Sequence, residues 1–311
     1  MIDISSNILT LLSLDGFGLV NSYKLLSSIE SIRTDNILEA LNEKKDFSIS
    51  SSEWFTTKNS FVEKLNESFE QNIIAVPFTS KDYPNALKEL NDFPLIIYVK
   101  GKLESLNVQN TLAIVGTRNP TKYTYDCAPE VCNIFASKSQ SVISGLAIGC
   151  DTIAHKSAIE MGIPTVAVLP NGLDHIYPKE NSNLAYKIID TGGCLVSEYL
   201  IGTKPNRYQF VARDRIQAGL SKAGFLLESS SKGGSMHCIK KLEKLRRKIY
   251  YLSPQNGAIN NESWTGNKLL GSKEKFIEIF PDSSNKEIST KIKDLFINEP
   301  NKNEFNQTSL F

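Results

Sequence analysis

The sequence reads Leu112-Ala113-Ile114-Val115-Gly116-Thr117-Arg118 where a short apolar run gives way to a glycine and an arginine. An uninterrupted apolar run of this length predicts a strand buried on both faces, as in a parallel sheet. The glycine allows a tight turn after the strand, and the arginine then projects at the sheet edge. The segment therefore predicts an open α/β sheet that binds its ligand beyond the carboxyl ends of its strands.

Similar apolar runs recur along the chain and alternate with helix-like stretches. We expect strands at 112–115, 142–144, 165–169, 194–197, 224–227 and 248–252. A helix is expected at 152–161, with Asp151 as its N-cap and Gly162 at its end. This alternation predicts an α/β fold, a Rossmann-like doubly wound parallel sheet covered by helices on both faces.

The chain divides into three parts by composition. Residues 1–72 show helical periodicity and predict a small helical domain, residues 73–280 hold the Rossmann-like domain, and residues 281–311 are polar and predict a flexible tail. The turn Leu14-Asp15-Gly16-Phe17-Gly18 fits a helix-hairpin-helix-like, phosphate-binding element or a plain interhelical turn. Its acidic surroundings favour the plain turn.

Composition excludes several classes of protein. The chain has 311 residues, of which 41% are hydrophobic, enough for a sizeable core. It has no apolar run of about 20 residues and no basic, then apolar, leader at its start, so we expect a cytoplasmic protein. Its five cysteines are scattered and its three histidines lack metal-ligand spacing. We therefore expect reduced thiols, no metal and no other cofactor.

The net charge of +1 conceals an asymmetry along the chain. Residues 1–110 carry 10 Lys and Arg against 15 Asp and Glu, whereas residues 202–251 carry 12 against 3. A local surplus of this size is typical of a polyanion-binding surface.

Three further segments favour anion binding through backbone N–H groups or guanidinium groups. Ser144-Gly145-Leu146-Ala147-Ile148-Gly149 follows the second strand, Arg213-Asp214-Arg215 is expected on a loop after another strand, and Lys232-Gly233-Gly234-Ser235 precedes a helix starting near Met236. Asp214 would hold one neighbouring guanidinium and leave the other free. Two alternatives stay open: Arg118 pairs with a local carboxylate, and the lysines of 240–248 form a solvated face.

The ordered motifs resemble those of the DNA-processing protein A (DprA/Smf) family. The resemblance lies in the segments 113–118, 144–155, 168–181, 197–198, 210–221 and 234–235, with Tyr83-Pro84, Leu87 and 94–101 upstream. It spans about residues 8–270.

The resemblance implies a homodimeric single-stranded DNA-binding protein that protects incoming strands and helps to load the RecA recombinase during natural transformation or recombination. It implies no enzymatic activity, and it implies that Asp151 and His155 shape the second loop. The expected DNA- or phosphate-binding residues are Gly116, Thr117, Arg118, Ser144, Gly145, Arg213, Arg215, Lys232, Gly234 and Ser235.

This chain departs from the family pattern at three places. Asp214 replaces the asparagine of the usual Arg-Asn-Arg, and Ile148 stands where many members have a basic residue. In the sequence after Pro281 we expect no counterpart of the winged-helix-like domain of many members.

The last residues, Gln307-Thr308-Ser309-Leu310-Phe311, resemble the peptide by which bacterial proteins dock on the replication sliding clamp. In that motif Gln307, Leu310 and Phe311 would make the contacts. The alternative is an accidental sequence, since short motifs recur by chance.

Two competing functions remain. A phosphoribohydrolase-like enzyme acting on nucleoside monophosphates would use similar loops, but the segment 228–237 lacks the Pro-Gly-Gly-x-Gly-Thr-x-x-Glu pattern of such enzymes. A scaffold that has lost DNA binding is motivated by Asp214 and Ile148.

Overall fold

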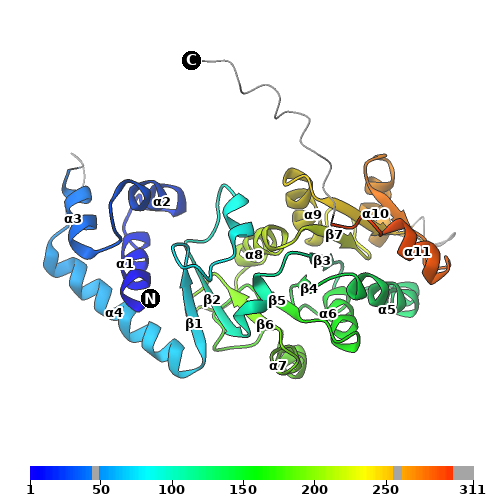
Figure 1. Ribbon diagram of the computed structural model, residues 1–311, viewed down its shortest axis with the longest axis horizontal. Coiled ribbons are helices and arrows are strands. Elements are labelled where there is room, and N and C mark those ends of the chain that lie inside the picture. Colours follow the sequence, from blue (N-terminus) through cyan, green and yellow to red (C-terminus); the bar gives the residue numbers. More distant parts are fainter. Residues whose placement is uncertain (44–48, 255–260, 297–311) are drawn as a thin grey trace, which may run out of the picture.

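The fold is described from a computed structural model in which residues 1–43, 49–254 and 261–296 are defined (Figure 1). The proposed clamp-binding residues Gln307, Leu310 and Phe311 lie outside these ranges.

Helices make up the first part of the chain, as its periodicity predicts. They are α1 (Ile2–Leu12), α2 (Leu19–Ser28), α3 (Thr34–Asn42) and α4 (Ser51–Glu70). Ser50 and Glu53 form a capping box that fixes the start of α4. The glycine turn between α1 and α2 places Gly16 at a φ of +80°, and the Asn21 side chain donates a hydrogen bond to its carbonyl at 2.8 Å.

The sheet has nine strands in the order β1-β2-β6-β5-β4-β3-β7-β8-β9. Its strands are β1 (Ile73–Pro77), β2 (Ile96–Gly101), β3 (Thr111–Val115), β4 (Ser141–Ser144), β5 (Thr165–Leu169), β6 (Cys194–Ser197), β7 (Ala223–Leu226), β8 (Lys248–Leu252) and β9 (Ile277–Ile279). The six expected strands are confirmed to within one residue at each end. Three more strands were missed.

The predicted Rossmann-like parallel sheet is confirmed, and two antiparallel strands extend it at one edge. β1 pairs with β2, and β2 with β6, in antiparallel register, whereas the pairs from β6 to β9 are parallel. The connection between β1 and β2 contains only a short 3-10 helix, Asn85–Glu89. Antiparallel neighbours need no crossover α-helix, so the strand–helix alternation that reveals the other strands is absent there. The α1 and α4 helices pack beside β1, and their buried residues Ile8, Leu11 and Trp54 join the core under this edge.

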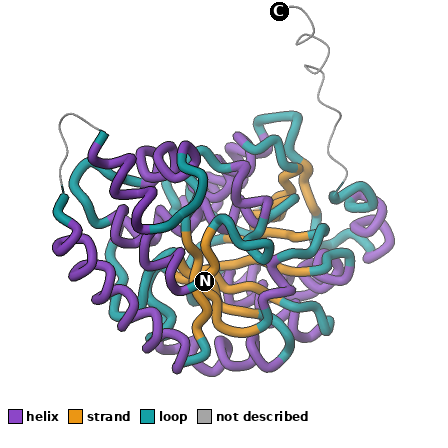
Figure 2. The backbone as a smooth tube through the Cα atoms, turned by 60° about the vertical axis from the view of Figure 1, so that its left-hand side comes forward, coloured by secondary structure: helices purple, strands orange, loops and turns teal. Residues whose placement is uncertain are grey.

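Helices cover both faces of the sheet (Figures 1 and 2). One face carries α5 (Lys122–Ser137), α6 (Cys150–Glu160) and α7 (Ser182–Asp190), and the other carries α8 (Arg207–Leu220) and α9 (Ser235–Lys244). Strand residues alternate between them. In β3, Leu112 and Ile114 join the core with α5 and α6, whereas Ala113 and Val115 join the core with α9.

The expectation of a flexible tail from Pro281 is wrong for the part that the structure describes. Helix α11 (Asn285–Lys291) follows α10 (Thr265–Gly271) and β9, and it begins with a capping box between Ser284 and Glu287. Ile288, Ile292 and Leu295 are buried in the core with α5. A few apolar residues at helical spacing are enough to hold α11 against the core, because α5 presents an apolar face to them.

Neither a membrane helix nor a metal cluster is found within the described ranges. None of their helices is long and apolar enough to cross a bilayer. Nor do these ranges hold three His, Cys, Asp or Glu side chains grouped to bind a metal ion. The five cysteines are free, and all but Cys127 are buried.

Candidate functional site

A pocket opens at the carboxyl ends of the parallel strands, where the winding of the sheet reverses at β3. This strand lies between β4 and β7, so the chain continues on opposite sides of it. Such a reversal opens a space between diverging crossover connections. The pocket, here called the crevice, measures about 560 Å³ and is lined by residues 115–119, Ala147, Asp151, parts of 210–217 and 229–235, and 262–263.

The loop after β3 is fixed by its backbone. The Thr117 amide donates to the carbonyl of Glu228 at 2.7 Å, so this N–H is not available to a ligand. A Cβ at Gly116 would lie 2.5 Å from Sγ of Cys150, and one at Gly149 would lie 2.5 Å from the carbonyl oxygen of Arg118. These glycines therefore let the loops after β3 and β4 pack against each other.

Arg118 is the exposed cation at the mouth of the crevice. Its guanidinium carbon lies 4.9 Å from the centre of the Phe210 ring. It makes no hydrogen bond or ion pair with any residue of the described ranges, so the alternative of a local carboxylate partner is wrong. A cation–π contact at an exposed site is worth only about 0.5–1 kcal/mol, which leaves the guanidinium able to turn toward an anion.

The loop after β4 is built around a buried arginine. A Cβ at Gly145 would collide with Nη1 and Cζ of the buried Arg213 guanidinium, so any side chain at this position would displace that group. Ser144 is buried and its hydroxyl donates to the Ile114 carbonyl at 2.7 Å. Gly145 lines an adjoining pocket beside Arg118, whereas Ser144 is a structural residue.

Asp151 and His155 hold this same loop in place. The Asp151 carboxylate accepts from the Ala147 amide at 3.3 Å, and Nε2 of His155 accepts from the Leu146 amide at 3.3 Å. Burial raises the pKa of Asp151, and the Arg213 guanidinium opposes this shift. Burial lowers the pKa of His155 to about 3, so the imidazole is neutral. Asp151 lies within the first turn of α6, and the N-cap is Gly149, at a φ of +80°, instead of Asp151.

The expected loop at 213–215 is a helix. Asn206 and Gln209 form a capping box that starts α8, a sequence signal that we missed. Arg213 lines the crevice but is only 7% exposed. Its Nη1 donates to the Val168 carbonyl at 2.9 Å and its Nε donates to Asp214 at 3.0 Å. Arg213 therefore supports the crevice as a partly neutralised charge.

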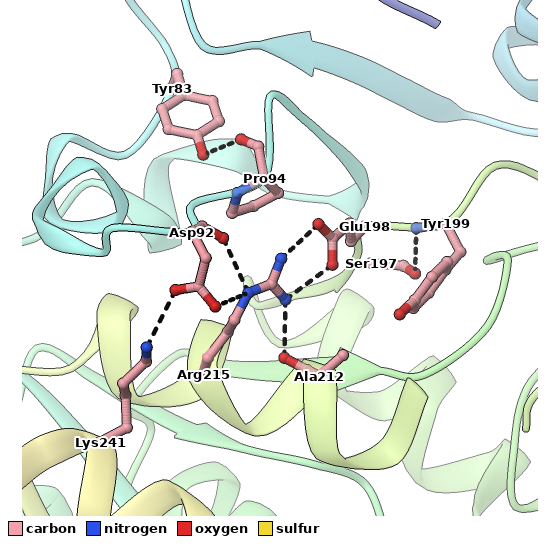
Figure 3. Close-up of polar contacts among 9 residues, drawn as sticks. All are labelled: Tyr83, Asp92, Pro94, Ser197, Glu198, Tyr199, Ala212, Arg215 and Lys241. Atoms are coloured by element: carbon pink, nitrogen blue, oxygen red, sulfur yellow. Dashed lines mark hydrogen bonds and ion pairs between the residues drawn. The ribbon is translucent and has the colours of Figure 1, made fainter. Parts of the chain in front are cut away.

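Arg215 does not line the crevice. Residues two apart on a helix point in different directions, so Arg215 leaves α8 away from Arg213. Its guanidinium donates to both carboxylate oxygens of Glu198, at 2.8 and 2.5 Å, and its Nε lies 3.3 Å from the Asp92 carboxylate (Figure 3). Arg213 and Arg215 are therefore not equivalent, because each guanidinium is held by different partners in the fold.

The last expected segment contributes mainly backbone. Gly233, Gly234 and Ser235 line the crevice, and α9 begins at Ser235 as expected to within one residue. The Ser235 hydroxyl donates to Oγ of Ser229 at 2.7 Å. Lys232 is exposed beside these residues but is not part of the lining.

Aromatic side chains beside Arg118 were missed as site residues. Phe210 lines the crevice and also the adjoining pocket of about 460 Å³, whose wall includes Tyr177 and Lys179. The Tyr177 and Phe210 rings meet edge to face, with centroids 5.4 Å apart. Both residues lie in segments that carry the family resemblance. Their place in these segments could have identified them as site residues.

Two acidic residues in the connection between β1 and β2, Glu89 and Asp92, pair with basic residues of the segment 202–251. Glu89 pairs with Lys222 at 2.8 Å and also with Arg247. Asp92 pairs with Lys241 at 3.0 Å. The acidic and basic segments of the sequence thus partly cancel in space, and the exposed positive charge is confined to fewer side chains.

The fold and the crevice define a Rossmann-like α/β protein with an arginine-bearing loop at its topological switch point. The chain belongs to the family of DNA recombination-mediator protein A, whose sequence model matches residues 74–283. The resemblance drawn from the motifs is therefore confirmed.

Individual relatives agree with this membership. The chain is 36% identical over 167 residues to DNA processing protein DprA of Bacillus subtilis, covering 54% of this chain and 56% of that protein. It is 36% identical over 161 residues to Protein Smf of Escherichia coli, covering 52% of this chain and 43% of that protein. The chain thus spans about half the length of these curated relatives.

Two solved structures have the same fold. DNA processing protein A of Helicobacter pylori, whose structure concerns its single-stranded DNA binding mode, has a TM-score of 0.61 and 28% identity over 71% of this chain and 97% of that one. DprA of Streptococcus pneumoniae has a TM-score of 0.66 and 22% identity over 97% and 94% of the two chains.

Proposed function

We propose that this protein binds single-stranded DNA at the crevice and does not act as an enzyme. The observation that carries the proposal is the exposed Arg118 guanidinium, which has no ionic partner in the described ranges and lies at the switch point of the sheet. Arginine at such an edge contacts phosphate by paired hydrogen bonds. The Helicobacter pylori relative, which binds single-stranded DNA, supports this assignment.

The surroundings of Arg118 suit a single strand better than a duplex. Phe210 and Tyr177 present aromatic surface next to the guanidinium, and unpaired bases stack on such rings regardless of sequence. Gly234 and Ser235 would complete the phosphate site from the start of α9. Arg213 and Gly145 would support this site, Thr117 and Ser144 would shape it, and Arg215 would take no direct part.

A binding role is favoured over catalysis because two titratable side chains near the crevice already hydrogen-bond to the protein backbone. Asp151 and His155 hold the loop after β4 through its amides, and the neutral His155 imidazole is fully buried. A nucleobase-release assay on nucleoside monophosphates tests this part of the proposal. Release that depends on Asp151 would contradict it.

The wider role that we propose follows from family membership. It comprises protection of incoming single strands, loading of RecA during natural transformation or recombination, a homodimeric state and a cytoplasmic location. Docking on the sliding clamp through Gln307, Leu310 and Phe311 is a further hypothesis. Unchanged clamp affinity after deletion of residues 307–311 would sink it.

The proposal is tested by titrating oligothymidylate binding against salt. For a single strand, each lost phosphate contact reduces the slope of log K against log salt by about 0.7. We expect Arg118→Ala to weaken binding strongly and to reduce the slope, whereas Arg118→Lys keeps the charge and retains part of the affinity. Arg33→Ala removes an exposed arginine at the start of α3 and is the matched control. Equal salt-dependent binding by Arg118→Ala and Arg33→Ala would refute the assignment.

A further inference from the structure

A second groove lies between α8 and α9, outside the crevice. It measures about 330 Å³, and its walls are Val211, Ala212 and Arg215 from α8 and His237, Lys240, Lys241 and Lys244 from α9, with Asp92 at one side. We call it the basic groove. The four α9 residues are spaced as i, i+3, i+4 and i+7, so they form one face of that helix.

The charges of the basic groove fall into two kinds. Arg215 and Lys241 are paired with acidic residues, and Figure 3 shows both side chains reaching toward Asp92. The side chains of Lys240 and Lys244 are exposed, and within the described ranges their ammonium groups form no hydrogen bond or ion pair. Like charges four residues apart repel each other on a helix. An anion lying over Lys240 and Lys244 would relieve that repulsion.

One face of α8 connects the basic groove with the crevice. Val211 lines both and is 46% exposed. Tyr208, one helical turn earlier on the same face, is 85% exposed. An exposed tyrosine one turn from the residue that both pockets share gives a flat ring on which a base can stack.

We propose that a single strand bound at Arg118 continues across Val211 into the basic groove, where Lys240 and Lys244 contact its phosphates and Tyr208 stacks on one of its bases. This inference rests on the proposed function and extends it from one pocket to a path. Charge complementarity selects the occupant, since the unpaired groups are cationic and the path begins at a site for a polyanion. A single strand offers both bases that stack on an exposed ring and phosphates that contact exposed lysines, and the path has both kinds of side chain.

The path is tested with oligothymidylates of two lengths, about 4 and about 16 nucleotides, because only the longer one reaches both sites. We expect Lys240→Ala/Lys244→Ala to bind the short strand like the unaltered protein. Binding of the long strand should weaken, and its salt slope should fall by about 1.4. Lys138→Ala/Lys286→Ala removes the same charge from exposed positions at α5 and α11, and is the control. Equal long-strand binding by the two double variants would overturn the path and leave the crevice proposal intact.

Tyr208 gives a readout that is independent of charge. We expect Tyr208→Ala to weaken long-strand binding at least about fivefold without changing the salt slope. The matched control is Tyr186→Ala, on α7 across the sheet, where the ring is 58% exposed. Similar long-strand affinities for these two variants would contradict the stacking of a base on Tyr208. Failure of the unaltered protein to bind either oligonucleotide would overturn both the crevice proposal and the path.

Discussion

The buried charge of Asp214 is less favourable in the folded than in the unfolded chain, and we predict that Asp214→Asn makes the fold more stable above pH 6. The carboxylate accepts a hydrogen bond from Nε of Arg213 at 3.0 Å, and the side chain is only 10% exposed. Burial raises the pKa of Asp214 to about 6, and the attraction of Arg213 only partly opposes this shift. Asparagine keeps the shape and an acceptor oxygen while removing the buried charge.

The direction in which stability changes with pH follows from the difference in proton binding between the folded and the unfolded chain. Below about pH 4, Asp214 is protonated in both states, and its contribution to stability is fully present. As the pH rises from about 4 to about 6, the unfolded chain releases its proton first, so this contribution is lost. A folded pKa of about 6 against an unfolded value of 3.8 costs roughly 3 kcal/mol at pH 8, and about half of that at pH 5.

Urea denaturation at pH 5 and pH 8 measures this difference. We expect Asp214→Asn to be more stable than the unaltered protein at both values, with the larger gain at pH 8. Asp190→Asn, at an exposed position on α7, is the control for any general effect of charge removal. An Asp214→Asn protein that is no more stable than the Asp190→Asn control at pH 8 would refute the reasoning.

The same substitution has a consequence for strand binding. Removing a negative charge from the wall of the crevice should strengthen oligothymidylate binding at pH 8 by roughly threefold to thirtyfold, for charges about 8 Å from a bound phosphate. The affinity of the unaltered protein should approach that of Asp214→Asn as the pH falls below 6, because Asp214 is then protonated. An affinity difference that is independent of pH would contradict this account.

Three other substitutions test the supporting structure. Gly145→Ala should cost about 3 kcal/mol or more, because the new methyl displaces the Arg213 guanidinium from its buried pair; an unchanged urea midpoint would contradict this. Glu198→Gln should destabilise the fold by roughly 3 kcal/mol because Arg215 is then less well paired, and it should leave the short-strand affinity unchanged. A loss of short-strand affinity without a loss of stability would show that Arg215 contributes to binding at the crevice. Ile288→Ala should cost about 2–5 kcal/mol because α11 is part of the core, and a difference within error of zero would restore the flexible-tail interpretation.

The sequence predicted the sheet where strands carry local signals. The run 165–169 in β5 and the run 194–197 in β6 are short, apolar and bounded by turns, and the structure has the same bounds. The antiparallel strands β1 and β2 were missed because they lack the intervening helix that marks a parallel crossover. The capping boxes at Asn206 and Ser284 show that local signals for α8 and α11 were also present. For α11 the polar composition of the segment favoured a flexible tail, and for α8 the segment 213–215 was expected to be a loop after a strand.

The candidate site was predicted less completely than the fold. The positions of Arg118, Gly145 and Gly234 at the carboxyl edge follow from glycine-containing turns after apolar strands, and the structure brings them to the crevice and its adjoining pocket. The different environments of Arg213 and Arg215 did not follow, because side chains two apart on a helix diverge and the segment was expected to be a loop.

By itself, the sequence determined the alternating elements, the switch-point loops and the family, since each is encoded by residues that are near neighbours in the chain. Only the tertiary structure decided which charges remain available to a ligand. Asp92 meets Arg215 across 123 positions of sequence, and Glu89 meets Arg247 across 158. Ion pairing depends on distance in space, so a surplus counted along the chain does not reveal which cations are neutralised. Folding pairs Arg213, Arg215, Lys222, Lys241 and Arg247 of the basic segment with carboxylates. The side chains of Arg118, Lys240 and Lys244 are among those that stay exposed without an ion pair in the described ranges.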